Sequence, residues 1–412
     1  MRPKYSIVVP VFNRPQELSE LLGSILKLKL EQPIEVVIIE DGSTEDSERV
    51  CQNFQREAHR ITDTLSRKRE TLLSTPAHID PQTVKRDTAL TALGVTSTHF
   101  SPAVDTGEHS KSFEGSSQIS SHETQRESPG LISLVYHKKE NTGPGHSRNC
   151  GVHKSSGEYV IFVDSDCILP PDYISEIDQY LSEDPLDFFG GPDRADTSFT
   201  DFQKAIDFAM TSVLTTGGVR GANTKNFQPR SFNMGVKRKA FLHVGGFGNI
   251  HPGEDPDLVF RLWREGYRSN LMPEAFVYHK RRISWSAFQK QVGNFGKVRP
   301  ILMKWHASSR SATFFLPSIA TLVAITAPLL FLFTGNYLLL VVGFFYIALL
   351  FLTAVLSLGS VRLALMAVRA SLTQILTYGS HFAISWFKLN ALGQQPKTAY
   401  PDRFFPDRPP CE

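Results

Sequence analysis

Short apolar runs alternate with helix-spaced apolar positions in the first part of the chain. The runs Ser6–Val11 and Glu35–Ile39 are rich in β-branched residues and predict two strands. Between them, after Pro15, leucine and isoleucine recur at helical spacing from Leu18 to Leu26. A strand, a helix and a second strand within about forty residues form a βαβ unit, which predicts a parallel sheet covered by helices.

The alternation of strand and helix patterns is absent from residues 57–130. Roughly a third of the segment is Ser or Thr, it has no Tyr, Trp or Cys, and its only aromatic residues are Phe100 and Phe113. Such a composition buries too little apolar surface to offset the entropy of an ordered chain. We therefore expect an insertion that is mostly disordered, with a short helix near Ile61–Leu73.

Strand patterns resume at Leu131–Tyr136 and Glu158–Val163, and the residues Arg148–Lys154 between them predict a helix. Mixed strand and helix signals continue to about Trp305. Without the insertion this leaves roughly 230 residues, a normal size for one domain. We expect a single α/β domain over residues 1–305.

Two long apolar segments follow this domain. Ala312–Phe333 and Tyr337–Leu358 lie in a stretch, Ser311 to Val361, without a single charged residue. Each segment can cross about 30 Å of hydrocarbon as a helix at 1.5 Å per residue. The pattern therefore predicts two transmembrane helices and excludes a purely soluble protein.

Basic residues flank both ends of this pair. Lys304 and Arg310 precede it and Arg362 and Arg369 follow it, whereas the connecting loop has no charge. The positive-inside bias places both ends in the cytoplasm. We therefore expect a multi-pass protein of the cytoplasmic (inner) membrane whose catalytic domain faces the cytoplasm.

The membrane region is expected to cover residues 306–390. Its last part, residues 370–387, has no formal charge but carries several polar side chains, and its apolar residues share one helical face. We expect a helix that lies in the membrane interface, with a third span as the alternative. Residues 391–412 would be a cytoplasmic tail.

Composition narrows the function further. The net charge is +3 and charged residues make up 21%, which argues against a nucleic-acid partner held by a dense basic surface. The four cysteines are far apart and form no CxxC pair, so they suggest neither a disulfide framework nor a zinc site. A reducing compartment is the expectation that follows. These cysteines are Cys51, Cys150, Cys167 and Cys411.

The sharpest chemical signal is the pair Asp164 and Asp166 directly after an apolar strand. Open α/β sheets bind ligands at the carboxyl ends of their strands. Two carboxylates there suit a hard divalent cation that keeps room for phosphate oxygens. The alternative is a turn in which these residues only cap backbone groups.

Other polar groups follow a strand or open a helix in the same way. Each has a plain structural alternative, such as the helix dipole for acidic residues in a first turn. Arg148 follows a glycine loop and is available to a phosphate. These groups are Glu40 and Asp41, Arg148, Glu254 and Asp255, and His279.

In this order, the motifs resemble those of the family 2 glycosyltransferases. The resemblance covers about residues 4–300 apart from the insertion, and the chain is similar to membrane-anchored bacterial members. It implies a GT-A (Rossmann-like) nucleotide-sugar-binding domain with a mainly parallel central sheet. The matching motifs are Val9–Arg14, Glu40–Ser43, Asn141–Gly143 with Arg148 and Asn149, Asp164–Asp166, Asn233 and Met234 with Gly245–Phe247, Glu254 and Asp255, and Tyr278 and His279.

The resemblance also implies roles for individual residues. Asp255 matches the catalytic base, with Glu254 beside it. Asp166 matches the direct metal ligand, with Asp164 near the ribose or the metal and His279 near the metal or the diphosphate. The nucleotide-sugar contacts would come from Pro10, Val11, Asn13, Glu40, Asp41, Arg148 and Asp164, although Asp is commoner than Glu at position 40.

The implied reaction is an inverting transfer that depends on Mn²⁺ or Mg²⁺. The donor would be a nucleotide sugar, a UDP-sugar first of all, and the acceptor a lipid-linked or glycan molecule at the membrane, in cell-envelope polysaccharide synthesis. Gln289, Gln291 and Arg299 resemble the acceptor-side helix of processive sugar synthases, but the tryptophan that completes that signature is absent. This favours transfer of a single sugar.

Two other functions stay open from the sequence. A polyprenyl-phosphate glycosyltransferase would use a lipid phosphate as acceptor and would need little base catalysis. A catalytically inactive, membrane-tethered scaffold that binds sugar nucleotides would need no base at all. Asp166, Asp255 and His279 argue against the scaffold, because all three motif positions are intact.

Overall fold

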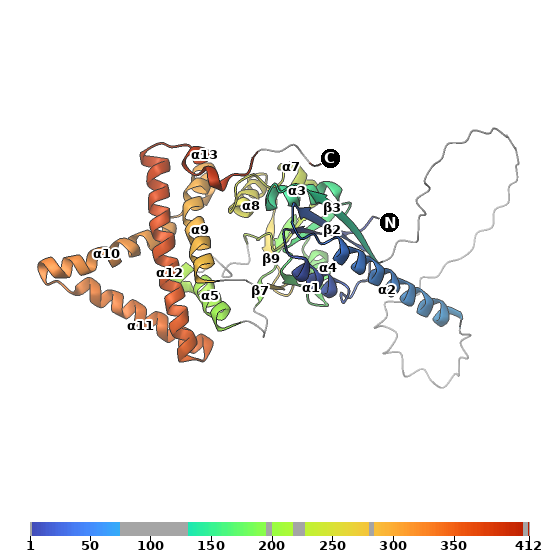
Figure 1. Ribbon diagram of the computed structural model, residues 1–412, viewed down its shortest axis with the longest axis horizontal. Coiled ribbons are helices and arrows are strands. Elements are labelled where there is room, and N and C mark those ends of the chain that lie inside the picture. Colours follow the sequence, from blue (N-terminus) through green and yellow to red (C-terminus); the bar gives the residue numbers. More distant parts are fainter. Residues whose placement is uncertain are drawn as a thin grey trace, which may run out of the picture. The chain divides into compact units, whose positions relative to one another are not determined.

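The computed structural model of the chain (Figure 1) describes residues 2–74, 131–194, 200–216, 227–279, 284–406 and 411. It divides into two compact units, His59–Gly130 and the remainder of the chain. A helix continues from Glu48 to Ser74, so the first part of the expected insertion is helical, as anticipated near Ile61–Leu73. Residues 75–130 lie outside the described ranges, and the disorder expected for them stays a prediction.

The larger unit is built on a seven-stranded sheet. Its strands are β1 (Tyr5–Val11), β2 (Ile34–Asp41), β3 (Ile132–Lys139), β4 (Tyr159–Val163), β6 (Phe188–Gly190), β8 (Asn233–Lys237) and β9 (Ser269–Leu271). They lie in the order β3-β2-β1-β4-β8-β6-β9, and all neighbours are parallel except β8, which is antiparallel to β4 and β6. The expected α/β class with a mainly parallel sheet is confirmed.

Helices cover both faces of this sheet (Figure 1). One core contains side chains from α1 (Pro15–Ile25), α2 (Glu48–Ser74) and α4 (Tyr173–Glu183), and the other contains side chains from α3 (Pro144–Lys154), α7 (Arg238–His243) and α8 (Glu254–Arg264). Along β1, Ile7 and Val9 enter the first core and Val8 enters the second. Burial on both faces explains why the strand is a continuous apolar run.

A small second sheet carries one of the expected site residues. Its strands are β5 (Cys167–Ile168), β7 (Asp193–Arg194) and β10 (Val277–His279), in the order β5-β10-β7. Antiparallel pairing sets His279 opposite Cys167. Because β5 begins directly after Asp166, this register brings together residues that are more than a hundred positions apart.

Four long helices follow the sheet domain, namely α9 (Trp285–Trp305), α10 (Leu316–Thr334), α11 (Leu338–Leu358) and α12 (Val361–Trp386). In Figure 1, α9 and α12 run side by side, and α10 and α11 form a hairpin that departs from α12. The short helices α5 (Asp201–Thr211) and α6 (Val213–Thr216) also contact α12.

In the part of the chain that the structure describes, two segments are long and apolar enough to cross a membrane, Ala312–Thr334 and Leu338–Leu358. Their ends agree within one residue with those expected from the sequence. Large apolar side chains on them are exposed, for example Phe333 at 86% and Leu356 at 77%, as suits lipid-facing surfaces. Residues 370–386 form the larger, C-terminal part of α12, and Phe387 begins the π-helical turn that follows it; their interfacial placement stays a prediction.

The C-terminal segment returns to the sheet domain. After α13 (Pro396–Ala399), Phe404 bridges Ile250. The N–H of Phe405 donates to the carbonyl of Asn249 at 2.9 Å, and the N–H of His251 donates to the carbonyl of Arg403 at 2.8 Å. The segment expected as a simple tail is therefore packed against the loop that leads into α8.

Candidate active site

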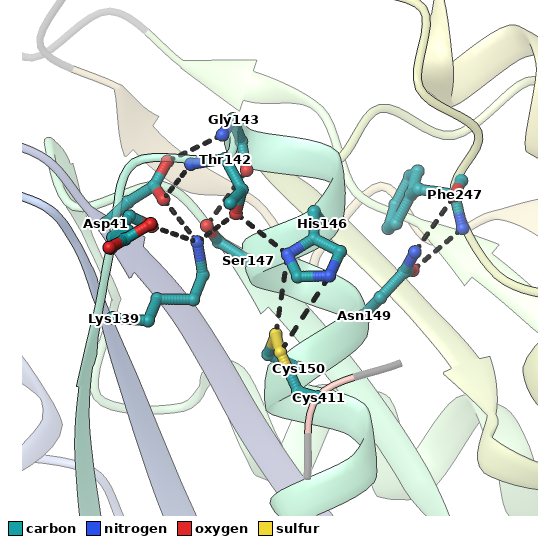
Figure 2. The surroundings of a disulfide bond; sticks show 11 residues. Asp41, Lys139, Thr142, Gly143, His146, Ser147, Asn149, Cys150, Phe247 and Cys411 are labelled. Carbon is teal, nitrogen blue, oxygen red and sulfur yellow. Dashed lines mark hydrogen bonds and ion pairs between the residues drawn. A yellow bond between two sulfur atoms is a disulfide. The ribbon is translucent and has the colours of Figure 1, made fainter. Parts of the chain in front are cut away.

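Asp41, at the end of β2, is held by the loop that leads into α3. Its carboxylate accepts the N–H of Thr142 at 2.9 Å and the N–H of Gly143 at 3.1 Å, and it pairs with Lys139 (Figure 2). The loops approach closely, because a Cβ on Gly42 would lie 2.5 Å from the backbone nitrogen of Asn141. The carboxylate proposed to hold the ribose is thus fixed in one orientation.

The loops after β1 and β2 are tied together beside Asp41. The N–H of Asn13 donates to Oγ of Ser43 at 2.8 Å, and Oδ1 of Asn13 accepts the N–H of Thr44 at 2.8 Å. Pro10 and Val11 lie opposite Ile39 and Glu40 in the sheet register.

Glu40 is fully buried and has a structural task in this turn. Its Oε2 accepts the N–H of Ser47 at 2.9 Å, and its Oε1 accepts the hydroxyl of Ser43. Both carboxylate oxygens therefore stabilise the turn after β2.

Arg148 lies between two acidic groups of the expected site. Its Nη2 donates to Oδ1 of Asp164 at 2.8 Å, and its Nη1 is 3.6 Å from Oε1 of Glu254. Its side chain is only 5% exposed. Arg148, which the sequence offered to a phosphate, thus links the carboxylates after β4 to those of α8.

Asp166 and His279 come together at the second sheet. Oδ1 of Asp166 is 3.2 Å from Nε2 of His279, and Oδ2 accepts a hydrogen bond from Arg14. Burial opposes the negative charge, but His279 and Arg14 lower the pKa of Asp166 overall. The carboxylate therefore stays ionised at neutral pH.

The donor set fits a divalent cation. Asp166, Cys167 and His279 each offer a ligand atom, and these atoms lie within 4.8 Å of one another. A hard cation prefers the carboxylate oxygen of Asp166 to the soft sulfur of Cys167, and the imidazole nitrogen of His279 is the second available ligand. Carboxylate oxygens suit Mg²⁺ and Mn²⁺. Asp164 pairs with Arg148 and is absent from this cluster in the described part of the chain.

Glu254 and Asp255 are adjacent at the start of α8, but their surroundings differ. Oε1 of Glu254 is 2.9 Å from Nδ1 of His251; burial opposes its charge, yet His251 and Arg148 lower its pKa overall. For Asp255, burial and then the charge of Glu254 raise the pKa. Adjacent carboxylates whose pKa values are pushed apart are suited to different tasks.

One carboxylate oxygen of Asp255 accepts a hydrogen bond, and the other has no hydrogen-bond partner among the described residues. Its Oδ2 accepts the N–H of Ser231 at 3.2 Å. Its Oδ1 is buried and has no hydrogen-bond partner among the described residues. A carboxylate with a raised pKa and an open oxygen can take a proton from a substrate hydroxyl.

Several residues of this site were missed by sequence reasoning. Arg14 contacts Asp166, His251 contacts Glu254, and Arg230 acts electrostatically on Asp255. Only the pair Asp257 and Arg261, four positions apart on α8, had a readable signal in the sequence. His251 precedes Glu254 by only three positions, whereas Arg14 with Asp166 and Arg230 with Asp255 join segments that are distant in the sequence.

The expectation that the cysteines form no disulfide is wrong. No disulfide was expected, yet Cys150 of α3 is bonded to Cys411 beside His146 (Figure 2). The spacing gave no sign of this pair because 261 positions separate the two residues. They meet because the C-terminal segment returns to the sheet domain. Cys51 and Cys167 are free and buried.

Several known proteins similar to this chain are glycosyltransferases. The family model described as Glycosyl transferase family 2 matches residues 6–73 and 118–245. A protein named as an uncharacterized glycosyltransferase from Haemophilus influenzae is 24% identical over 158 residues, covering 37% of this chain and 53% of that protein. The match thus spans about half the length of that relative. Glycosyltransferase GlyG from Streptococcus pneumoniae is 21% identical over 67% of this chain and 70% of its own.

One solved structure has a similar fold over nearly the whole chain. It is the mannosyltransferase PcManGT from Pyrobaculum calidifontis, determined in complex with GDP-Man and Mn²⁺. The TM-score is 0.50 at 16% identity, and the superposition covers 94% of this chain and 88% of that one.

Proposed function

Because the chain belongs to the family 2 glycosyltransferases and has the GT-A fold, we propose that it moves one sugar from a nucleotide-sugar donor to a membrane-associated acceptor, with inversion at the anomeric carbon. The observation that carries this proposal is the state of Asp255. Its Oδ1 is buried and has no hydrogen-bond partner in the described ranges, and burial together with the charge of Glu254 raises its pKa.

The proposed reaction is a single displacement. The acceptor hydroxyl oxygen attacks the anomeric carbon, its proton passes to Oδ1 of Asp255, and the bond to the donor diphosphate breaks. A positioned base typically contributes about 10²–10⁴-fold to such a step. Glu254 stays ionised between His251 and Arg148, so its role is to position α8 and to raise the pKa of Asp255.

The donor would lie across the carboxyl ends of β1, β2 and β4. Asp41, fixed by Thr142 and Gly143, is proposed to contact the ribose, beside the loop that Asn13 orders. This edge of a doubly wound sheet is where nucleotides bind in such folds. UDP-sugars are the donors to test first.

Asp166 and His279 are proposed to hold a Mn²⁺ or Mg²⁺ ion. When bound there, the cation offsets negative charge on the leaving nucleoside diphosphate. This chain's own contribution is to keep Asp166 ionised and oriented, through Arg14 and through the β5–β10 register.

We also propose that the two apolar helices anchor the chain in the cytoplasmic membrane, with the sheet domain on the cytoplasmic side. Lys304, Arg310, Arg362 and Arg369 flank the helix pair, and the loop between its helices is uncharged, which supports this orientation. An acceptor in the same membrane would then reach the site by lateral diffusion.

A donor screen tests the proposal. The purified full chain is incubated with Mn²⁺ or Mg²⁺ and with individual UDP- and GDP-sugars, and release of nucleoside diphosphate is measured. We expect one donor to be hydrolysed well above the others, and we expect Asp255→Asn to suppress its hydrolysis. Release from none of these donors, by a folded protein with either cation, would contradict the proposal.

A further inference from the structure

The C-terminal segment completes a cluster of two sulfurs and an imidazole on α3. His146 and Cys150 belong to α3, and Cys411 reaches them from the C-terminal segment (Figure 2). Nδ1 of His146 is 3.7 Å from Sγ of Cys150, and its Nε2 is 4.0 Å from Sγ of Cys411. The three residues can each offer one ligand atom within 4.8 Å of the other two. This cluster is distinct from that of Asp166 and His279.

The backbone holds the cluster together without the disulfide. Residues four positions apart on a helix share one face, so α3 itself places His146 beside Cys150. Cys411 comes six positions after Phe405, whose N–H donates to the carbonyl of Asn249 at 2.9 Å. The ring of Phe405 also covers the start of α3, since a Cβ on Gly143 would lie 2.5 Å from its Cε2. Opening the disulfide therefore leaves Cys411 close to α3.

The bond between Cys150 and Cys411 is the oxidised state of this pair. In a reducing compartment, such as the cytoplasmic side proposed for the sheet domain, cellular dithiols open bonds of this kind. Thiol–disulfide exchange moves two electrons and two protons to the pair and leaves the dithiol as a disulfide. Two thiols then lie beside the imidazole of His146.

This donor set selects zinc. Zn²⁺ binds cysteine sulfur at about 2.3 Å and histidine nitrogen at about 2.0–2.1 Å in a tetrahedral arrangement. At those lengths a sulfur and a nitrogen lie about 3.6 Å apart, close to the 4.0 Å between Nε2 of His146 and Sγ of Cys411. Two thiolates also neutralise the charge of the ion. Mg²⁺ and Mn²⁺ prefer oxygen ligands, so this site would take a different metal from that of Asp166.

A partner that orients the histidine is already in place. Oγ1 of Thr142 is 2.8 Å from Nδ1 of His146. A metal-binding histidine usually donates its other ring N–H to an oxygen acceptor, which fixes the tautomer. With Nδ1–H donating to Thr142, Nε2 presents its lone pair on the side of Cys411. The backbone N–H of Thr142 donates to Asp41, so the cluster is joined to the candidate active site.

We propose that the reduced thiols of Cys150 and Cys411, together with Nε2 of His146, bind a Zn²⁺ ion that fastens the C-terminal segment to α3. Binding releases the two thiol protons. Water fills the fourth position, because the cluster has three donors among the described residues. The ion keeps the segment in place in a reducing compartment, as the disulfide does in an oxidising one. This inference does not depend on sugar transfer.

Zinc binding to the reduced full chain tests the inference. The detergent-solubilised protein is reduced with a phosphine, the phosphine is removed, and Zn²⁺ is titrated in competition with a chromophoric chelator. All titrations use the Asp166→Ala background, so that a cation at the candidate active site does not contribute. The added variants are Cys411→Ser, His146→Gln and Thr142→Val. The matched control is Cys51→Ser, at a free cysteine outside the cluster.

We expect one equivalent of Zn²⁺ per reduced chain and none before reduction. Cys411→Ser and His146→Gln should weaken binding at least about a hundredfold, because even outer-shell changes cost about 10–100-fold, and Thr142→Val should weaken it about tenfold. Cys51→Ser should not change it. In the reduced chain, Zn²⁺ should also slow hydrogen exchange at the amide of Phe405.

A reduced, folded chain that binds no Zn²⁺ would overturn the proposal, and so would equally tight binding by Cys411→Ser. A disulfide that the phosphine cannot open in the folded chain would overturn it as well. Circular dichroism checks the fold of each variant; if His146→Gln on α3 does not fold, Cys411→Ser, outside the sheet and its helices, gives the same comparison. Failure of the donor screen with intact zinc binding would count against the proposed function alone.

Discussion

Nε2 of His306 donates a hydrogen bond to Oδ1 of Asp257 across 2.8 Å, and both side chains are buried. Asp257 is two residues beyond Asp255 on α8, and His306 follows the last residue of α9. The contact therefore fixes the helix of the proposed base against the segment that leads into the apolar helices. Arg261 completes the cluster, 2.8 Å from the other oxygen of Asp257.

Asp257→Ala should destabilise the fold by about 3–5 kcal/mol, because it leaves His306 and Arg261 without their carboxylate. Thermal and chemical unfolding of the detergent-solubilised protein measure the loss. The control is Asp184→Ala, at an exposed ion pair with Arg268, where about 0–1 kcal/mol is expected. Equal stability of the two variants would show that the buried contact of Asp257 contributes no more to the free energy of unfolding than the exposed ion pair of Asp184.

The difference in stability between the wild type and Asp257→Ala should depend on pH. Burial opposes the charge of Asp257, but His306 and Arg261 lower its pKa overall from the ordinary value of 3.8. A lowered pKa stabilises the fold above the unfolded value, and this contribution disappears as the pH falls through the folded one. The stability gap between wild type and Asp257→Ala should therefore be full at neutral pH and narrow below 3.8.

Binding of Mn²⁺ should depend on Asp166. We expect Mn²⁺ to raise the midpoint of thermal unfolding, and we expect Asp166→Ala to lose this shift together with sugar transfer. Asp46→Ala is the control, since Asp46 is an exposed partner of Lys138 outside the cluster of Asp166 and His279. Full transfer in excess chelator would rule out the cation requirement.

Residues 75–130, the part of the expected insertion that follows α2, should be dispensable for catalysis. Replacing residues 75–130 by a short Gly/Ser linker after α2 should preserve turnover within severalfold, because the strands on either side already pair in the sheet. Turnover and circular dichroism of the shortened chain check this. A folded but inactive product would mean that the segment shapes the site or recruits the acceptor.

The disulfide can be checked by counting thiols. In the denatured, unreduced protein, alkylation followed by mass spectrometry should label Cys51 and Cys167, and reduction should add Cys150 and Cys411. Disulfides are uncommon in a reducing cytosol, so the count also bears on the proposed compartment. Four labelled thiols before reduction would show that the bond does not form in the isolated protein.

Much of the fold could be predicted from local patterns. The strands β1, β2 and β4 appear in the sequence as apolar runs. The ends of α10 and α11 follow from the length of the uncharged stretch and from the basic residues beside it. The antiparallel β8 and the small sheet that sets His279 opposite Cys167 could not be predicted, because they depend on pairing between distant strands.

The site shows the same division. Asp164 and Asp166 follow a strand and Asp255 lies in the first turn of a helix, and polar groups at such ends are recognisable in the sequence as candidate ligand-binding residues. Their partners are harder to predict, since Arg14 is 152 positions from Asp166, and His251, although three positions before Glu254, lies outside the helix that Glu254 begins. Glu40 also shows the limit: its place after a strand suggested ligand contact, whereas the structure gives both its oxygens to the turn at Ser43 and Ser47. Its expected nucleotide contact stays a prediction.

The central claim is that Asp255 is the base of a nucleotide-sugar transferase, and one comparison tests it most directly. The rate of nucleoside diphosphate release by the wild type is measured against pH, together with Asp255→Asn and Glu254→Gln. We expect Asp255→Asn to lower kcat by about 10²-fold or more with little change in donor affinity, and Glu254→Gln to cost less.

The acid limb of the wild-type profile should have its midpoint above the ordinary aspartate value, because burial and Glu254 raise the pKa of Asp255 and only the ionised form accepts a proton. Near-normal turnover by Asp255→Asn beside an inactive Glu254→Gln would contradict the account and assign the base to the neighbouring residue.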